Sequence, residues 1–300
     1  MNADMQNEDM QDKVVVMTGA TSGIGQVAAE SLAARGARIV QVGRDRGRGE
    51  AAVQRLRGLG PGVAHAIHYA DLSRLSEMKR VAADIAAAER RVDVLVNNAG
   101  AIFSSREVVE GQERTFALNH VSYFVLAHAL RERLVSSAPA RVVNTASDAH
   151  RGATLDFDDL QSERAYRGSF AAWPRYGGPG FKVYSRSKLC NVLFTRELAR
   201  RLAGTGVTAN CLHPGFVATR FGDESGGLLH LGLRVAKRFA LSPQQGAETL
   251  VYLASSPEVA GVTGEYFHKC RPATPTREAQ DAAAARRLWT ETARLAQLED

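Results

Sequence analysis

Short runs of apolar and β-branched residues alternate along the chain with longer stretches in which alanine, leucine and arginine recur at helical spacing. The apolar runs predict strands at Lys13–Thr18, Ala37–Val42, Val63–Tyr69, Val92–Asn97, Arg141–Ala146 and Val207–His213. The longer stretches predict helices at Gly25–Arg35, Arg46–Leu59, Leu75–Arg90, Glu113–Val135 and Leu189–Leu202. This alternation favours an α/β fold in which helices flank a doubly wound parallel sheet.

Two of the predicted strands lack polar alternation. Val14–Met17 and Val94–Val96 are apolar at every position, as expected for strands that helices cover on both faces. We therefore expect a single domain over residues 13–270. Residues 1–12, which carry acids and no apolar run, are expected to form a disordered leader, and residues 271–300 a C-terminal helical extension.

The composition excludes several classes of protein. Hydrophobic residues make up 45% of the chain and charged residues 23%, which are ordinary globular values. The net charge of +6 and the pI near 9.4 favour solubility over nucleic-acid binding, because the basic residues are interleaved with 32 acids. No apolar run is long enough to span a membrane, and the three cysteines and eight histidines form no metal-binding pattern. We expect a soluble, cytoplasmic protein with reduced thiols and no metal.

A glycine-rich turn follows the first predicted strand, with the spacing Gly-x-x-x-Gly-x-Gly. Gly19 allows the sharp turn, Gly23 allows the backbone to approach a pyrophosphate, and Gly25 allows close packing of helix on strand. The N-terminus of the next helix adds unpaired N–H groups and positive potential. The turn thus predicts a dinucleotide site, and the expected contacts include Thr21, Ser22 and Ile24 as well as the three glycines.

The end of the second predicted strand indicates which dinucleotide binds. An NAD enzyme places a carboxylate here on the ribose 2′-OH, but this chain has Gly43 followed by Arg44. The planar guanidinium of Arg44 suits a 2′-phosphate and favours NADP over NAD. Two alternatives stay open: Arg44 is a solvated loop charge, or Asp45 competes for it.

Tyr184 and Lys188 are four residues apart at the start of a predicted helix and therefore lie on one helix face. A free phenol has a pKa of about 10, and a cation within about 4 to 6 Å favours the phenolate. The pair is suited to acid–base catalysis at neutral pH. By itself, the spacing also fits a solvated helix pair.

Five motifs in order resemble the short-chain dehydrogenases/reductases: the glycine turn, Asn97-Asn98-Ala99-Gly100, Ser147, Tyr184 with Lys188, and Pro214-Gly215. The resemblance spans residues 13–270 and implies a Rossmann-type sheet. Finer features resemble the retinol dehydrogenase and WW-domain-oxidoreductase branch. They are Asn119-His120, Arg141 to Asn144, Leu189-Cys190-Asn191, His213-Pro214-Gly215, Gly264 to Phe267, and a tail with Leu288-Trp289.

The resemblance implies roles for individual residues. Tyr184 would exchange a proton with the substrate oxygen, Ser147 would hydrogen-bond that oxygen, and Lys188 would tune Tyr184 and bind the nicotinamide ribose. Asn119 would hold a water that links Lys188 to solvent. The remaining cofactor contacts implied by the family are Asp71, Leu72, Asn98, Ala99, Gly100, Pro214, Gly215 and Val217.

One departure from the compact members of the family is the spacing of Ser147 and Tyr184, which are 184 − 147 = 37 positions apart. Residues 151–182 are interpreted as an inserted loop. Its aromatic residues either line a substrate pocket or anchor the loop. They are Phe157, Tyr166, Phe170, Trp173 and Tyr176.

These features predict an oxidoreductase that transfers a hydride between NADP(H) and a hydroxyl or carbonyl carbon of an apolar small molecule. Reduction of a carbon–carbon double bond and non-catalytic sensing of NADP are the alternatives. Residues 215–242 are expected to form a substrate lid, although a helix at residues 228–239 would also suit an anionic membrane surface. The family resemblance implies a homo-oligomer.

Overall fold

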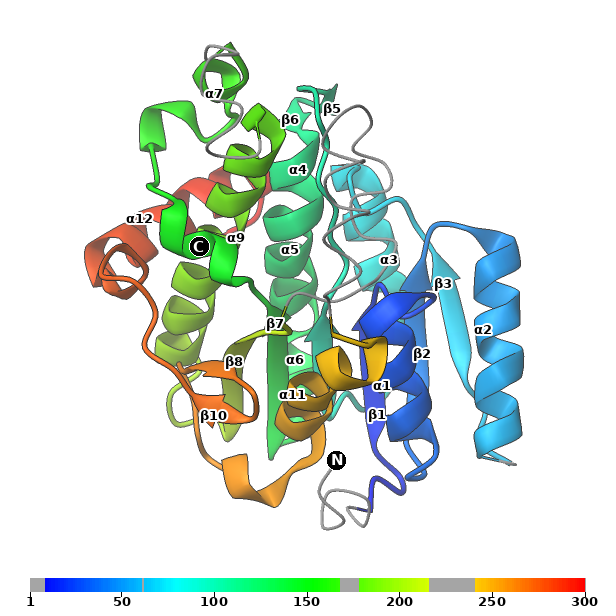
Figure 1. The fold of residues 1–300 in the computed structure, drawn as a ribbon. Helices are drawn as coiled ribbons and strands as arrows, with labels where there is room; N and C mark the ends of the chain where they lie inside the picture. Colours follow the sequence, from blue (N-terminus) through cyan, green and yellow to red (C-terminus); the bar gives the residue numbers. More distant parts are fainter. Residues whose placement is uncertain (1–8, 61, 168–177, 216–240, 300) are drawn as a thin grey trace.

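The computed structural model describes residues 9–60, 62–167, 178–215 and 241–299. An eight-stranded sheet runs through its centre in the order β10-β9-β8-β7-β4-β1-β2-β3 (Figure 1). Its strands are β1 Val14–Thr18, β2 Arg38–Gly43, β3 Ala66–Tyr69, β4 Val94–Asn97, β7 Ala140–Thr145, β8 Val207–His213, β9 Tyr266–His268 and β10 Arg271–Pro272. All neighbours are parallel except β9 and β10. The six strands expected from the sequence are confirmed, whereas β9 and β10 are too short for a periodic pattern.

Helices cover both faces of the sheet (Figure 1). One layer contains α1 Gly23–Ala33, α2 Arg46–Leu59 and α11 Pro243–Ser255. The other contains α3 Leu75–Ala88, α5 Ser122–Ala129, α6 Arg131–Ser136, α9 Gly178–Arg201 and α12 Ala282–Ala296. Along β1, Val15 and Met17 face the first layer and Val16 the second, and all three are fully buried. The uninterrupted apolar runs therefore do mark strands buried on both faces.

The helix expected at Glu113–Val135 is divided into several pieces. A short hairpin of β5 Val108–Val109 and β6 Gln112–Glu113 leads into α4 Arg114–Phe116, and a π-helical turn at Ala117–Val121 precedes α5. The π turn holds an extra residue, which apolar spacing does not reveal. It carries two of the polar residues that the sequence singled out, Asn119 and His120.

Helix α9 begins at Gly178, before Tyr184, which was expected to open the helix, and well before Leu189, where the apolar pattern predicted one. The inserted segment at 151–182 therefore ends inside this helix. A 3-10 turn at Asp148–Gly152 leads into the insert, whose other described elements are a 3-10 turn at Phe157–Asp159 and helix α7, Glu163–Arg167. Since α9 extends upstream, Tyr184 lies within the helix rather than at its first turn.

Both ends of the described chain pack more closely than the sequence suggested. Met10, expected in a disordered leader, is buried in the core beside α1, and its N–H donates to Arg35 O. The expected C-terminal helix is α12, but Leu288 and Trp289 place it in the core against α9 and α5. Among the described residues, no helix is long and apolar enough to cross a membrane.

Candidate active site

The turn between β1 and α1 requires glycine at three positions, for reasons of conformation or of space. Gly19 and Gly23 have φ values of 65° and 58°, in the left-handed region that glycine adopts readily. A Cβ on Gly25 would lie 2.2 Å from Gly19 O, and one on Gly19 would lie 2.9 Å from Ala99 Cα. Ser22, the N-cap of α1, makes no capping hydrogen bond with its side chain. The helix N-terminus is therefore suited to receive an anion.

The segment after β4 is tied to this turn. The N–H groups of Asn98 and Ala99 donate to Thr18 Oγ1 at 2.9 and 3.0 Å, and Asn98 Nδ2 donates to Gly19 O at 3.1 Å. Thr145 Oγ1, at the end of β7, donates to Asn98 Oδ1. These bonds join the carboxyl ends of β1, β4 and β7 where the strand order reverses, which is where doubly wound sheets bind ligands.

Arg44 lies beside two carboxylates at the end of β2. Burial raises the pKa of Asp71, but hydrogen bonds from the Ser73 backbone and hydroxyl, with the charge of Arg44, outweigh burial and leave this pKa below its usual value. Asp45 caps α2 by accepting from Arg48 N at 2.8 Å and pairs with the Arg48 guanidinium at 3.6 Å. Asp45 thus has a partner of its own in Arg48.

Leu72 also lies at this end of the sheet, after β3. Its side chain is buried in the core. The adenine contact that the family resemblance implies for Leu72 stays a prediction.

The four predicted catalytic residues meet at the carboxyl end of β7. Tyr184 and Lys188 project from α9, Ser147 follows β7, and Asn119 comes from the π turn. A side-chain hydrogen bond joins Ser147 to Tyr184. Lys188 Nζ lies 5.6 Å from the centre of the Tyr184 ring. Residues far apart in the sequence thus form one cluster.

Burial dominates the acid–base properties of this cluster. It raises the pKa of Tyr184 to about 12, against the opposing effect of the Ser147 hydrogen bond. It lowers the pKa of Lys188 to about 7. Both charged forms are costly here without further partners, so the tuning of Tyr184 by Lys188 remains a proposal.

Hydrogen bonds fix Asn119 and Lys188 in place. Asn119 Oδ1 accepts from Ala101 N at 2.9 Å, and its Nδ2 donates to Ala101 O and Ser187 Oγ, both at 3.0 Å. Lys188 Nζ donates to Thr145 O at 2.8 Å. A Cβ on Gly100 would lie 3.2 Å from Asn119 Oδ1 and 3.5 Å from Lys188 Nζ, so this glycine keeps the space beside the ammonium open.

Thr145 and Ser187 were not singled out from the sequence. Ser187 Oγ donates to Tyr184 O and so connects Asn119 with α9. Ser187 lies inside the Tyr-x-x-x-Lys motif, whose interior positions could have drawn attention to it. The contribution of Thr145 comes from a backbone carbonyl, which the identity of a side chain does not reveal.

Pro214 and Gly215 follow β8. Gly215 has a φ of 86°, and a Cβ there would lie 2.5 Å from Leu241 Cδ1. Residues 216–240, with Val217 and nearly all of the predicted lid, are outside the described residues.

Two aromatic residues of the insert anchor it. The Tyr166 hydroxyl lies 3.3 Å from Phe103 O and 3.4 Å from Glu113 Oε1, and Phe157 packs beneath Arg287, with 4.2 Å from Cζ to the ring centre. These contacts support the anchoring interpretation for both residues. Phe170, Trp173 and Tyr176 lie outside the described residues.

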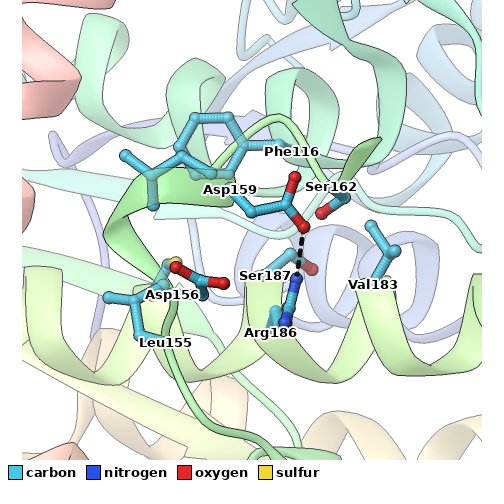
Figure 2. A pocket seen from close by; sticks show the side chains of 10 residues that line it. Phe116, Leu155, Asp156, Asp159, Ser162, Val183, Arg186 and Ser187 are labelled. Atoms are coloured by element: carbon cyan, nitrogen blue, oxygen red, sulfur yellow. Dashed lines mark hydrogen bonds and ion pairs between the residues drawn. The ribbon is translucent and has the colours of Figure 1, made fainter. Parts of the chain in front are cut away.

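Figure 2 shows a small cavity between the insert and α9, with the ion pair of Arg186 and Asp159 at 3.4 Å on its wall. Its lining comprises Phe116, Leu155, Asp156, Asp159, Leu160, Ser162, Val183, Arg186, Ser187 and Cys190. Since none of the four predicted catalytic residues lines it, this cavity is separate from the catalytic cluster.

The sequence matches known families along most of its length. The profile described as short chain dehydrogenase covers residues 13–155, and that described as Enoyl-(Acyl carrier protein) reductase covers residues 165–269. The chain is 41% identical over 302 residues to retinol dehydrogenase 14 of Homo sapiens, with 93% of this chain and 85% of the relative covered. The chain belongs to the short-chain dehydrogenase/reductase family. The predicted resemblance to its retinol dehydrogenase branch is confirmed.

Solved structures agree with this short-chain dehydrogenase/reductase assignment. An uncharacterised protein from Mycobacterium Paratuberculosis superposes with a TM-score of 0.73 at 30% identity, covering 98% of this chain and 96% of that one. The Pseudomonas aeruginosa RhlG/NADP active-site complex superposes with a TM-score of 0.67 at 26% identity, covering 89% of this chain and 97% of that one. The predicted Rossmann-type fold and oxidoreductase class are therefore confirmed.

Proposed function

We propose that this protein transfers a hydride between NADP(H) and the hydroxyl or carbonyl carbon of an apolar small molecule, with Tyr184 as the general acid and base. The observation that carries the proposal is the cluster at the end of β7. There Ser147 hydrogen-bonds Tyr184, and Lys188 lies beneath the phenol ring. The names of the curated relatives suggest retinol and retinal as the first substrates to test.

The dinucleotide fits the chain at two places. The tight glycine turn leads directly into α1, whose N-terminal N–H groups are not capped by the Ser22 side chain and are available to a pyrophosphate. Arg44 offers a guanidinium to a 2′-phosphate where NAD enzymes carry an acid. NADP in the RhlG complex supports the same cofactor here. When bound, NADP(H) would supply or accept the hydride.

In the reductive direction, Tyr184 gives its hydroxyl proton to the substrate oxygen while the carbon receives the hydride, so a carbonyl becomes an alcohol and a phenolate remains. Ser147 holds the same oxygen by a hydrogen bond. The Lys188 ammonium stabilises the phenolate through its charge, and a proton from solvent restores the hydroxyl. Oxidation of the alcohol reverses each transfer.

Consumption of NADPH and of NADH is measured with retinal and a series of aliphatic aldehydes and ketones, for the wild type and Tyr184→Phe. We expect turnover with NADPH in the wild type and almost none in the variant. If no substrate in the series is turned over although NADPH binds, the NADP-sensing alternative is favoured.

Reduction of a carbon–carbon double bond remains a second candidate because residues 165–269 match a family described as an enoyl reductase. An α,β-unsaturated aldehyde separates the two reactions. An allylic alcohol as product supports the proposed function, whereas a saturated aldehyde contradicts it. Homo-oligomerisation and a cytoplasmic location also remain proposals; gel filtration and cell fractionation would test them.

A further inference from the structure

A chain of buried polar side chains connects the C-terminal helix α12 with the catalytic cluster. Thr292 on α12, His120 in the π turn and Asn191 on α9 are all fully buried. Thr292 Oγ1 lies 3.0 Å from His120 Nε2, and His120 Nδ1 lies 3.3 Å from Asn191 Oδ1. Three separate elements thus meet in a single line of contacts.

The direction of each hydrogen bond follows from the last member of this line. Asn191 Nδ2 donates to Asn119 O at 2.9 Å and to Thr145 O at 3.3 Å, so its Oδ1 is left to accept from His120 Nδ1. Burial lowers the pKa of His120 to about 4, so the ring is neutral at physiological pH. A neutral ring that donates through Nδ1 accepts through Nε2, and Thr292 is therefore the donor there.

The line ends at the backbone carbonyls of Thr145 and Asn119, two residues of the catalytic cluster. Thr145 O accepts both from Asn191 Nδ2 and from Lys188 Nζ. Asn119 O accepts from the same amide, and the side chain of Asn119 lies beside Lys188 across Gly100. One amide group therefore fixes the carbonyl that accepts from Lys188 and the backbone of Asn119, whose side chain lies near the ammonium.

Aromatic packing holds α12 in the position that this line requires. The centre of the Trp289 ring lies 4.7 Å from the ring centre of Phe124 and 5.8 Å from that of Phe194. The Arg201 guanidinium lies over the Trp289 ring, with Cζ 4.3 Å from the ring centre. The His120 ring packs edge-on against Phe194 at 5.8 Å. Phe194 thus packs against both Trp289 of α12 and His120, the residue that Thr292 contacts.

We propose that His120, Asn191 and Thr292 are positioning residues, which fix the carbonyls of Thr145 and Asn119 and thereby set the place of the Lys188 ammonium beneath Tyr184. Through them the C-terminal helix becomes part of the proton-transfer geometry. This inference rests on the proposed function. The competing explanation is that the three residues only satisfy one another's hydrogen bonds in the core, which would affect stability alone.

Thr292→Val tests the proposal because valine has nearly the same shape as threonine but cannot donate to His120. Thr292→Ser keeps the hydroxyl and serves as the rescue. The matched control is Thr249→Val: Thr249 is a buried threonine on α11, in the other helical layer, and its Oγ1 accepts from Cys270 N at 3.1 Å. Melting temperature, kcat and KM are measured for all three variants.

Loss of one buried hydrogen bond in the line is expected to lower kcat roughly three- to tenfold in Thr292→Val, with KM nearly unchanged. Thr292→Ser should keep most of the wild-type kcat. Thr249→Val should lower the melting temperature without lowering kcat. If kcat of Thr292→Val equals that of the wild type, or falls no further than in the control, the positioning role is wrong.

A second measurement does not depend on turnover. The pKa of Lys188 is followed by NMR in protein with isotope-labelled lysine, with Lys188→Arg identifying the resonance. Tyr184 and Tyr123, whose ring centres both lie 5.6 Å from Lys188 Nζ, are the titratable groups that face it among the described residues. A Lys188 pKa that moves in Thr292→Val but not in Thr249→Val supports the line even if no substrate is found. An identical pKa in both variants and the wild type contradicts it.

Discussion

Replacing Lys188 with methionine is expected to abolish catalysis and to stabilise the fold, by an amount that depends on pH. Burial lowers the Lys188 pKa from 10.5 to about 7. Since the unfolded chain binds the proton more tightly, this residue destabilises the native state below pH 10.5, fully so below about pH 7. Methionine fills similar space without a charge and removes this cost.

The size of the effect follows from the shift of 10.5 − 7 = 3.5 pKa units. At 1.36 kcal/mol per unit, the penalty is about 5 kcal/mol near pH 6 and falls to about 2 kcal/mol near pH 9. Loss of the hydrogen bond to Thr145 O offsets about 1.5 to 3 kcal/mol of the gain near pH 6, where Lys188 is charged, and about 0.5 to 1.5 kcal/mol near pH 9, where it is neutral. The variant should therefore be more stable than the wild type near pH 6, and this advantage should shrink by about 1 to 2 kcal/mol near pH 9.

Urea denaturation of both proteins near pH 6 and pH 9 gives the two differences in unfolding free energy, and NADPH consumption gives activity. Lys182→Met is the matched control, because Lys182 is exposed on the same helix. The control should change stability little at either pH. If Lys188→Met exceeds the wild type in unfolding free energy by the same amount at both pH values, the lowered pKa of Lys188 is refuted, because an effect of packing alone does not depend on protonation.

Three further substitutions test the site. Tyr184→Phe should lower kcat by about 10²- to 10⁴-fold while NADPH affinity, followed by fluorescence, stays within a few fold; a rate within about tenfold of the wild type contradicts the acid–base role. Arg44→Ala should weaken NADP(H) binding roughly ten- to hundredfold and NAD(H) binding little, whereas equal losses would indicate a structural arginine. Gly25→Ala should weaken both cofactors in calorimetry, because its Cβ would lie 2.2 Å from Gly19 O and force the turn apart; unchanged affinities would contradict the tight turn.

The fold was predictable where local pattern and burial agree. A strand that helices cover on both faces carries an uninterrupted apolar run, and such runs allowed β1 and β4 to be predicted. Helix α2, Arg46–Leu59, lies where its periodicity predicted. The π turn and the early start of α9 were not predictable, because a π turn keeps the residue composition of a helix and the start of α9 at Gly178 is rich in glycine.

In the candidate site, too, some features could be predicted from the sequence and others could not. Residue types and their order along the chain determined the glycine turn, the Tyr184 and Lys188 pair, and the resemblance to the family, because each of these depends on chemistry carried by nearby residues. Only the tertiary structure decided that Thr292 contacts His120, which lies 172 positions earlier in the chain. The same is true of the Thr145 carbonyl that accepts a hydrogen bond from Lys188. The first contact depends on how α12 packs against α9, which no single residue determines. The second uses a backbone carbonyl, which every residue has, so the type of residue at that position does not reveal it.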